Sequence, residues 1–197
     1  MRKTARTAVP VHPLLAERWS PRGFDRDLLV SDEDVTALLE AARWAPSAGN
    51  SQPWRFLVAR RGEQAHGELF TALQPGNQQW AGAAGALILV AARTAGEGGA
   101  PQPFALYDTG QAVGSLITQA QARGLATHQI GGFDSDQVRA AFGLDASLTP
   151  VVVIAVGHAS QDAELPAHLA ARETAPRTRH ALSDLLITAE ARELQAA

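Results

Sequence analysis

Arginines at even spacing, four residues apart near the start of the chain and two apart near its end, could together bind an anion. In extended backbone, side chains two positions apart point to the same side, so each group can converge on one ligand. The planar guanidinium group suits a phosphate monoester well. From spacing alone, solvated arginines or surface ion pairs remain the alternative. The residues concerned are Arg18, Ser20 and Arg22 in the first group, and Arg177 and Arg179 in the second.

A loop of small and amide-bearing residues is a second candidate binding segment. Its small residues let backbone approach a flat ligand, and its amide side chains offer both donors and acceptors. An ordinary turn is the alternative interpretation. The same two readings apply to Gly131 and Gly132, whose backbone N–H groups could face a ligand or could form a turn. The loop residues with this potential are Pro46, Ser47, Asn50 and Gln52.

Composition limits the classes of protein that this chain can represent. With 197 residues, 46% of them hydrophobic and 19% charged, we expect one globular domain over residues 1–197. The formal net charge of −3 argues against a nucleic-acid partner. There is no cysteine, so redox chemistry would require a cofactor. The six histidines lack the spacing of a metal site, so no bound metal is expected.

Targeting signals are not apparent in the chain. The basic start is interrupted by Pro10 and Pro13 and lacks the apolar stretch of a secretory signal, so we expect a cytoplasmic protein. The longest uncharged apolar stretch, residues 80–92, is shorter than the ~18 residues that span a bilayer, and no membrane partner is expected. Residues 1–12 are predicted to form a flexible or partner-crossing arm.

Hydrophobic patterning predicts a mixture of helices and strands without a strict βαβ rhythm, which favours the α+β class. One helix begins at Ser31, a capping residue with Asp34 in the capping-box position, and ends by Pro46. Two of the strands are continuously apolar, which indicates burial on both faces. The remaining predicted elements are helices over residues 62–73, 104–123 and 135–142, strands over 54–60, 86–92 and 150–157, and a short helix or extension from Leu182.

The longest predicted helix, residues 104–123, is rich in small residues. Gly124 and Leu125 follow it in the manner of a glycine C-cap with its apolar contact. Its composition predicts a central helix that is buried on most sides. Asp108 near its start is expected to bind local backbone rather than to act in catalysis.

Four separated segments, in this order and spacing, resemble the nitroreductase family of flavin-dependent oxidoreductases. They are RWSPRGFD, AARWAPSAGNSQPWRFLV, YDTGQAVGSLITQAQARGLATHQIGGFD and PVVVIAVG, and the resemblance spans about residues 14–186. It implies a mainly antiparallel central sheet flanked by helices. It also implies an intertwined homodimer with FMN at the interface.

The resemblance assigns each candidate residue a role toward FMN. Arg18 and Ser20 match positions that hold the phosphate and ribityl end, and Arg22 matches a basic residue near the pyrimidine edge of the flavin. Gly131 matches the residue whose backbone N–H faces flavin N5, and Gly132 follows it in the turn. The remaining matches are Pro46, Ser47, Asn50 and Gln52 in a loop that reaches FMN from the other subunit, and Arg177 and Arg179 closing on the phosphate. Asn77 stands near a cofactor-contacting asparagine of larger relatives, but it is not included among the assigned cofactor residues.

The implied function is hydride transfer from NAD(P)H through flavin N5 to a small electrophilic acceptor such as a nitroaromatic, a quinone or an enone. No catalytic side chain is needed, because the protein supplies positioning and electrostatics. His128 could donate a proton to substrate, or it could be a packed or solvent-facing histidine. Flavin breakdown, dehalogenation or ring oxidation on the same fold, and a non-catalytic FMN-binding protein, remain alternatives.

Overall fold

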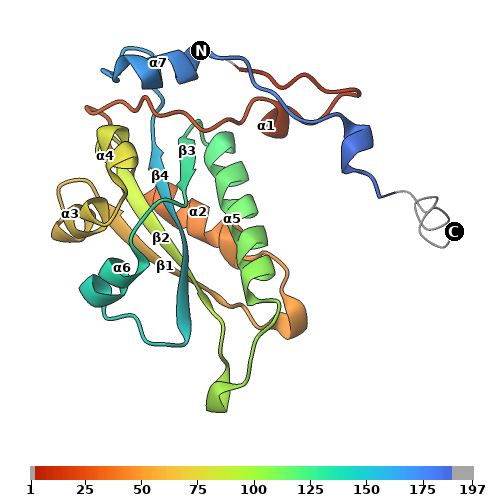
Figure 1. Cartoon of the computed structure of the whole chain (residues 1–197), viewed down its shortest axis with the longest axis vertical. Helices are drawn as coiled ribbons and strands as arrows, with labels where there is room; N and C mark the ends of the chain where they lie inside the picture. Colours follow the sequence, from red (N-terminus) through yellow and green to blue (C-terminus); the bar gives the residue numbers. More distant parts are fainter. Residues whose placement is uncertain (1–2, 188–197) are drawn as a thin grey trace, which may run out of the picture.

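The computed structural model describes residues 3–187, which fold around one four-stranded sheet (Figure 1). The strand order is β1-β2-β4-β3, and every neighbouring pair is antiparallel. This arrangement confirms the α+β class and the antiparallel sheet. The strands are β1 (Trp54–Arg60), β2 (Ala86–Arg93), β3 (Ala126–Ile130) and β4 (Leu148–Gly157).

Helices cover both faces of the sheet (Figure 1). Helices α2 and α5 pack on one face, and α3, α4 and α6 pack on the other. The α-helices are α1 (Pro13–Ala16), α2 (Asp32–Arg43), α3 (Gln64–Thr71), α4 (Pro75–Ala81), α5 (Ala105–Ala122), α6 (Ser135–Phe142) and α7 (Ala167–Thr174). Short 3₁₀ turns are η1 (Ala48–Asn50), η2 (Glu97–Gly99) and η3 (Leu182–Leu185).

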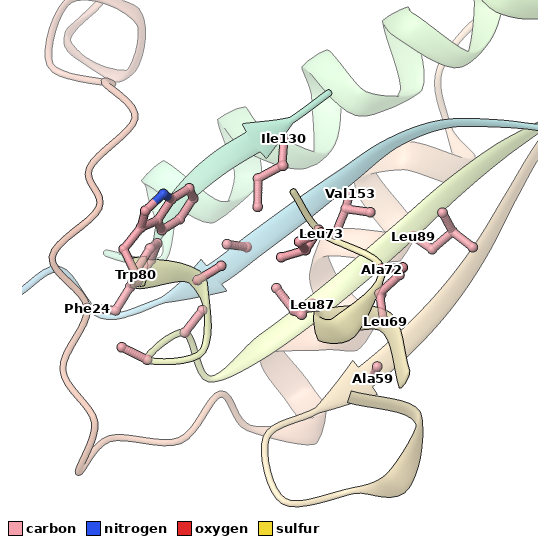
Figure 2. Close-up of a cluster of buried hydrophobic side chains, with 14 of the residues drawn as sticks. Phe24, Ala59, Leu69, Ala72, Leu73, Trp80, Leu87, Leu89, Ile130 and Val153 are labelled. Atoms are coloured by element: carbon pink, nitrogen blue, oxygen red, sulfur yellow. The ribbon is translucent and has the colours of Figure 1, made fainter. Parts of the chain in front are cut away.

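Strand β2 shows why the buried strands have no alternation of polar and apolar residues. Leu87 and Leu89 belong to the core under α3 and α4, where Figure 2 shows them near Leu69. Ile88 and Val90 face the opposite core, under α2 and α5. Both faces of the strand are therefore covered by helices, and each position along it has to be apolar.

Helix α2 begins as the sequence predicts. Ser31 Oγ accepts from the Asp34 N–H at 3.0 Å, and the Asp34 carboxylate accepts from the Ser31 N–H at 3.3 Å. The helix ends at Arg43, three residues before Pro46. Arg123, directly after α5, binds the Asp34 carboxylate at 2.5 Å and so joins the end of α5 to the start of α2.

Helix α5 differs from its predicted environment. Its end is as expected, since Gly124 adopts φ +75° and the Leu125 N–H donates to the Ala120 carbonyl at 2.9 Å. However, the helix buries only the face that packs on the sheet and α2. Leu106 and Tyr107, near its start, are 53% and 69% exposed. The prediction of burial on most sides is therefore wrong for this chain by itself.

Several other elements depart from the predicted pattern. The helix expected over residues 62–73 is shorter, because Gly62 adopts φ +94° and α3 spans only Gln64–Thr71. The pattern predicts none of β3, α1, α4 and α7. Helix α4 carries one recognisable signal, Pro75 at its first turn. Helix α7 carries little, because Leu169 is its one buried residue.

The two ends of the described chain run beside each other at one end of the molecule (Figure 1). The Ala5 N–H donates to the Ala16 carbonyl at 2.7 Å, and Lys3 Nζ donates to the Arg172 carbonyl at 3.3 Å. The arm therefore contacts its own chain from Lys3 onward, and residues 1–2 and 188–197 lie outside the described part. No helix between residues 3 and 187 is long and apolar enough to cross a membrane.

Candidate functional site

The segment that carries Arg22 is attached to the sheet beyond the end of β4. The Gly23 carbonyl accepts from the Ser160 N–H at 3.0 Å, and the Asp25 N–H donates to the His158 carbonyl at 2.9 Å. A Cβ on Gly23 would lie 2.5 Å from the Ser160 carbonyl oxygen, so only glycine fits. These contacts fix the backbone on the C-terminal side of Arg22.

An aromatic stack fixes the same segment from the side of β3. The ring of Trp80 lies between Phe24 and His128, with centroid distances of 6.2 and 4.4 Å. Trp80 is fully enclosed, and Figure 2 shows it beside Phe24 at one end of the core. His128 Nδ1 lies 2.9 Å from the Pro21 carbonyl. Because that oxygen can only accept, Nδ1 carries the proton.

His128 is a packed residue, as one of the two sequence interpretations expects. Burial lowers its pKa below the ordinary value, and the hydrogen bond to Pro21 opposes that shift only in part. The imidazole is therefore neutral near pH 7, with its one N–H engaged. It anchors the N-terminal segment to β3 and has no proton to give to a substrate.

The arginines from the two ends of the chain come together. Arg18 Nη1 donates to Ser20 Oγ at 3.1 Å. The pKa of Arg18 lies below its ordinary value because its guanidinium is buried and because Arg177 and Arg179 add positive charge nearby. The pKa of Arg177 is lowered by burial and by Arg179. Among the described residues, none of these three arginines is ion-paired with a carboxylate.

Arg177 has a second task in this cluster. Its Nη1 donates to the carbonyls of Lys3 and Ala16 at 2.6 and 2.7 Å. Arg179 Nη1 donates to the adjacent Thr178 carbonyl at 2.7 Å. Only part of each guanidinium is used by these contacts, since arginine has five N–H donors. The cluster therefore keeps N–H donors for an anion, and no carboxylate of residues 3–187 compensates its positive charge.

The two glycines after β3 have different surroundings. The Gly132 carbonyl accepts from Asn77 Nδ2 and from the Gln74 N–H, both at 3.0 Å. A Cβ on Gly132 would lie 2.8 Å from Asn77 Nδ2 and 2.9 Å from Gln74 Oε1. A Cβ on Gly131 would meet nothing within 4 Å. Residue 132 is thus locked by α4, and Gly131 is presented at the surface.

The loop over residues 46–52 has an unusual backbone. Gly49, Asn50 and Gln52 adopt φ of 58°, 55° and 44°, a region that residues with a Cβ rarely occupy. The Gln52 N–H donates to Ser47 Oγ at 3.0 Å, and the Ala48 N–H donates to Asp108 Oδ2 at 3.0 Å. The loop is therefore a specific 3₁₀ turn, closed internally by Ser47 and tied to α5 by Asp108. The expectation that Asp108 binds backbone close to it in sequence is wrong, because its carboxylate accepts from a residue 60 positions away.

The loop and the arginines lie at opposite ends of α5 (Figure 1). Ala48 contacts the first turn of the helix, whereas Trp19 and Pro21 line a hollow with Gln121 of its last turn and with Gly124. An α5 of 18 residues is ~27 Å long. One chain therefore brings together Arg18, Ser20, Arg177 and Arg179, and it does not bring Pro46, Ser47, Asn50 and Gln52 to them.

Two residues near the site carry no sequence signal. Glu173 on α7 lies 3.5 Å from the Arg22 guanidinium, across 151 positions of sequence. Trp80 is enclosed under the N-terminal segment. An aromatic residue in a short helix gives no sequence signal that it packs against a distant segment. Only the folded chain reveals either contact.

These features define a class of α+β protein that carries a cluster of arginines at one end of α5. Its other candidate binding segment, the loop over residues 46–52, lies at the opposite end of the same helix. The model of the Nitroreductase family matches residues 15–158. The chain therefore belongs to the Nitroreductase family.

Individual relatives agree with this assignment. The chain is 39% identical over 142 residues to a Mycolicibacterium smegmatis protein named "Uncharacterized 15.4 kDa protein in ask 5'region", covering 68% of this chain and 95% of that relative. It is 28% identical over 186 residues to "Putative NAD(P)H nitroreductase YdgI" of Bacillus subtilis (strain 168), covering 76% and 88%. A solved structure described as an oxidoreductase containing FMN superposes with a TM-score of 0.88 at 33% identity, covering 94% of both chains.

Proposed function

We propose that the protein is an FMN-dependent oxidoreductase that takes hydride from NAD(P)H and passes it to an electrophilic acceptor such as a nitroaromatic, a quinone or an enone. The observation that carries this proposal is the cluster of Arg18, Arg177 and Arg179. Within residues 3–187 no carboxylate pairs with these three guanidinium groups, and such a cluster is unfavourable unless an anion joins it. The names of the relatives, one containing FMN and one an NAD(P)H nitroreductase, support FMN and NAD(P)H as the cofactor and the donor.

The phosphate of FMN fits the arginine cluster chemically. Ser20 Oγ already accepts a hydrogen bond from Arg18, so its own O–H can donate to a phosphate oxygen. Arg18, Arg177 and Arg179 supply charge-assisted N–H donors. We assign these four residues to the phosphate and ribityl end.

The flavin ring is assigned to the edge of β3. The contact between Pro21 and His128 holds Arg22 beside this strand, and Gly131 lies three residues further along it, which is ~10 Å in extended chain. We propose that the Gly131 N–H faces N5, that Gly132 shapes the turn, and that Arg22 lies near the pyrimidine edge.

A second copy of the chain is proposed to complete the site. Residues Pro46, Ser47, Asn50 and Gln52 lie about the length of α5 from the arginine cluster, too far to reach the same cofactor within one chain. The exposed apolar side chains at the start of α5 offer surface for such a homodimer. The loop of one copy would then meet the arginine end of the other.

FMN, when bound, accepts and donates hydride at N5. The chain's own residues bind its phosphate, orient its ring and set the charge around it. No side chain of this site has to act as a nucleophile, which agrees with the absence of cysteine from the sequence.

The visible absorption spectrum of the purified protein tests this function, with released FMN quantified per chain and NADH or NADPH then added under nitrogen. We expect about one FMN per chain, and bleaching on addition of the nicotinamide. Turnover of nitroaromatics, quinones and enones would then identify the acceptor class. FMN that binds but is not reduced would favour a carrier or another flavin chemistry. A protein that fails to bind added FMN would end the proposal.

A further inference from the structure

The carboxylate of Glu173 binds Arg22 through both backbone and side chain. Its Oε2 accepts from the Arg22 N–H at 3.0 Å and from the Gly23 N–H at 3.5 Å. Its Oε1 lies 3.5 Å from Arg22 Nη1. The two side chains are 17% and 22% exposed, so this pair is more enclosed than a typical surface ion pair.

Glu173 completes the enclosure of the Arg22 segment. The Gly23 carbonyl is held by Ser160, and the Pro21 carbonyl is held by His128, which fixes two sides of the turn. Helix α7 closes a third side, and Glu173 is the residue of α7 that bonds to the turn. The position of the Arg22 guanidinium therefore depends on an acid from the C-terminal part of the chain.

The charge of this pair has a consequence for a bound flavin. A guanidinium near the ring favours the reduced form, which carries more negative charge than the oxidised form. A carboxylate that neutralises the guanidinium opposes that preference. Arg22 thus has its own counter-ion, whereas Arg18, Arg177 and Arg179 have none among the residues that the structure describes.

We infer that Glu173 is a positioning residue for Arg22, which fixes the guanidinium and offsets its charge, and so lowers the reduction potential of the bound FMN. This inference rests on the proposed function, because it requires FMN with its pyrimidine edge near Arg22. It adds a residue of α7 that no sequence motif indicates.

The decisive variant is Glu173→Gln, which keeps an oxygen that accepts from the Arg22 N–H and removes the charge. The readout is the midpoint potential of the bound FMN, measured by reductive titration against a reference dye under nitrogen. We expect a positive shift that corresponds to about a tenfold tighter relative binding of reduced FMN, or ~30 mV for a two-electron couple. Glu164→Gln, which removes an exposed acid near the same segment, is the matched control and should leave the potential unchanged.

A double-variant cycle separates an effect through Arg22 from a general effect of charge. Arg22→Gln should shift the potential negatively. Glu173→Gln added to it should then produce a smaller positive shift than in the parent protein, because only the direct effect of the lost charge remains and no guanidinium is left to position. An equal shift from Glu173→Gln in both backgrounds would overturn the positioning role. If Glu173→Gln is too unstable to hold FMN, Glu173→Asp retains the charge and should keep the potential close to that of the parent protein, and a positive shift there would also count against the inference.

The outcomes distinguish this inference from the proposed function. If the parent protein binds no FMN, the proposed function fails first. If the parent protein and Glu173→Gln both bind FMN with the same potential, the proposed function stands and the role of Glu173 is rejected. Melting temperatures of the FMN-free proteins show whether the substitution affects only the fold, because a purely structural role would lower the melting temperature without moving the potential.

Discussion

The backbone N–H of Ala48 donates to the carboxylate of Asp108 at 3.0 Å, so the first turn of α5 holds the loop over residues 46–52. Asp108 is 3% exposed, which places the acceptor inside the protein although the loop itself is at the surface. The other end of α5 lies beside the N-terminal arginine segment. One helix therefore sets the positions of both candidate binding segments.

Replacing Asp108 with Ala should loosen this loop. The lost hydrogen bond has a charged acceptor, so we expect the free energy of unfolding to fall by about 1.5–3 kcal/mol. FMN affinity should fall as well, because the loop of each copy is proposed to contact the cofactor. Urea unfolding and FMN titration measure the two effects. Asp136→Ala, which removes an exposed acid from the first turn of α6, is the control, and equal behaviour of the two variants would refute the role of Asp108.

The two glycines after β3 should respond differently to the same substitution. Gly132→Ala places a Cβ within 2.9 Å of the side-chain amides of Asn77 and Gln74. These flexible ends can shift, so we expect a loss of about 1 kcal/mol in stability, mainly from the hydrogen bond of Asn77 to the Gly132 carbonyl. Gly131→Ala has open space and should cost much less. Thermal unfolding of both variants checks this, and a larger loss for Gly131→Ala would contradict the geometry.

Arg18→Ala should weaken FMN binding without weakening the fold. Removal of one charge-assisted contact to a phosphate costs about 1.5–3 kcal/mol, or roughly a tenfold to hundredfold rise in Kd. The FMN-free protein should be no less stable, because burial, and after it the nearby Arg177 and Arg179, disfavour the charge of Arg18. Equilibrium dialysis with FMN measures the affinity, and Arg139→Ala on α6 provides a basic control. Unchanged affinity in Arg18→Ala would remove the phosphate assignment.

Two defective variants should complement each other if two chains share one site. Arg18→Ala damages the arginine end, and Asn50→Ala damages the loop. A mixed dimer contains one site with both defects and one site with neither. We therefore expect the mixture to regain tight FMN binding, at up to one FMN per mixed dimer, after refolding together. Absence of recovery, with mixed dimers verified by differently tagged chains, would contradict a site built from two copies.

Acid should destabilise the protein partly through His66. This side chain is buried, its Nε2 has no hydrogen-bond partner within the described part of the chain, and burial lowers its pKa below the ordinary value of 6.5. As the pH falls through 6.5, the unfolded state binds a proton that the folded state excludes, so the free energy of unfolding decreases, by at most ~1.4 kcal/mol per pH unit.

Urea unfolding measures this effect as the difference between the free energies of unfolding at pH 8 and at pH 5.5. His66→Leu should flatten this dependence in part, and the remainder comes from His128, whose pKa is shifted in the same direction. His168→Gln, at an exposed position of α7, should leave the dependence as it is. A parent protein that is equally stable at both pH values would show that neither histidine is excluded from protonation.

Local sequence determined the elements whose signals lie within one turn or one strand. The capping box of Ser31 and Asp34, the glycine end of α5 and the apolar runs of β2 and β4 are such signals, because hydrogen bonds between near neighbours and burial on both faces restrict the residue types directly. Helix α7 escaped prediction because burial of Leu169 alone leaves no periodic pattern.

The candidate site likewise has features that local sequence predicts and features that only the folded chain shows. The alternation of arginines and the composition of the 46–52 loop were visible in the sequence, because they are properties of adjacent residues. The meeting of Arg18 with Arg177, the closure of Glu173 on Arg22, and the separation of the loop from the arginines by the length of α5 depend on contacts across most of the chain. Such contacts are set by how helices pack on the sheet, and no local pattern of residue types encodes their distances.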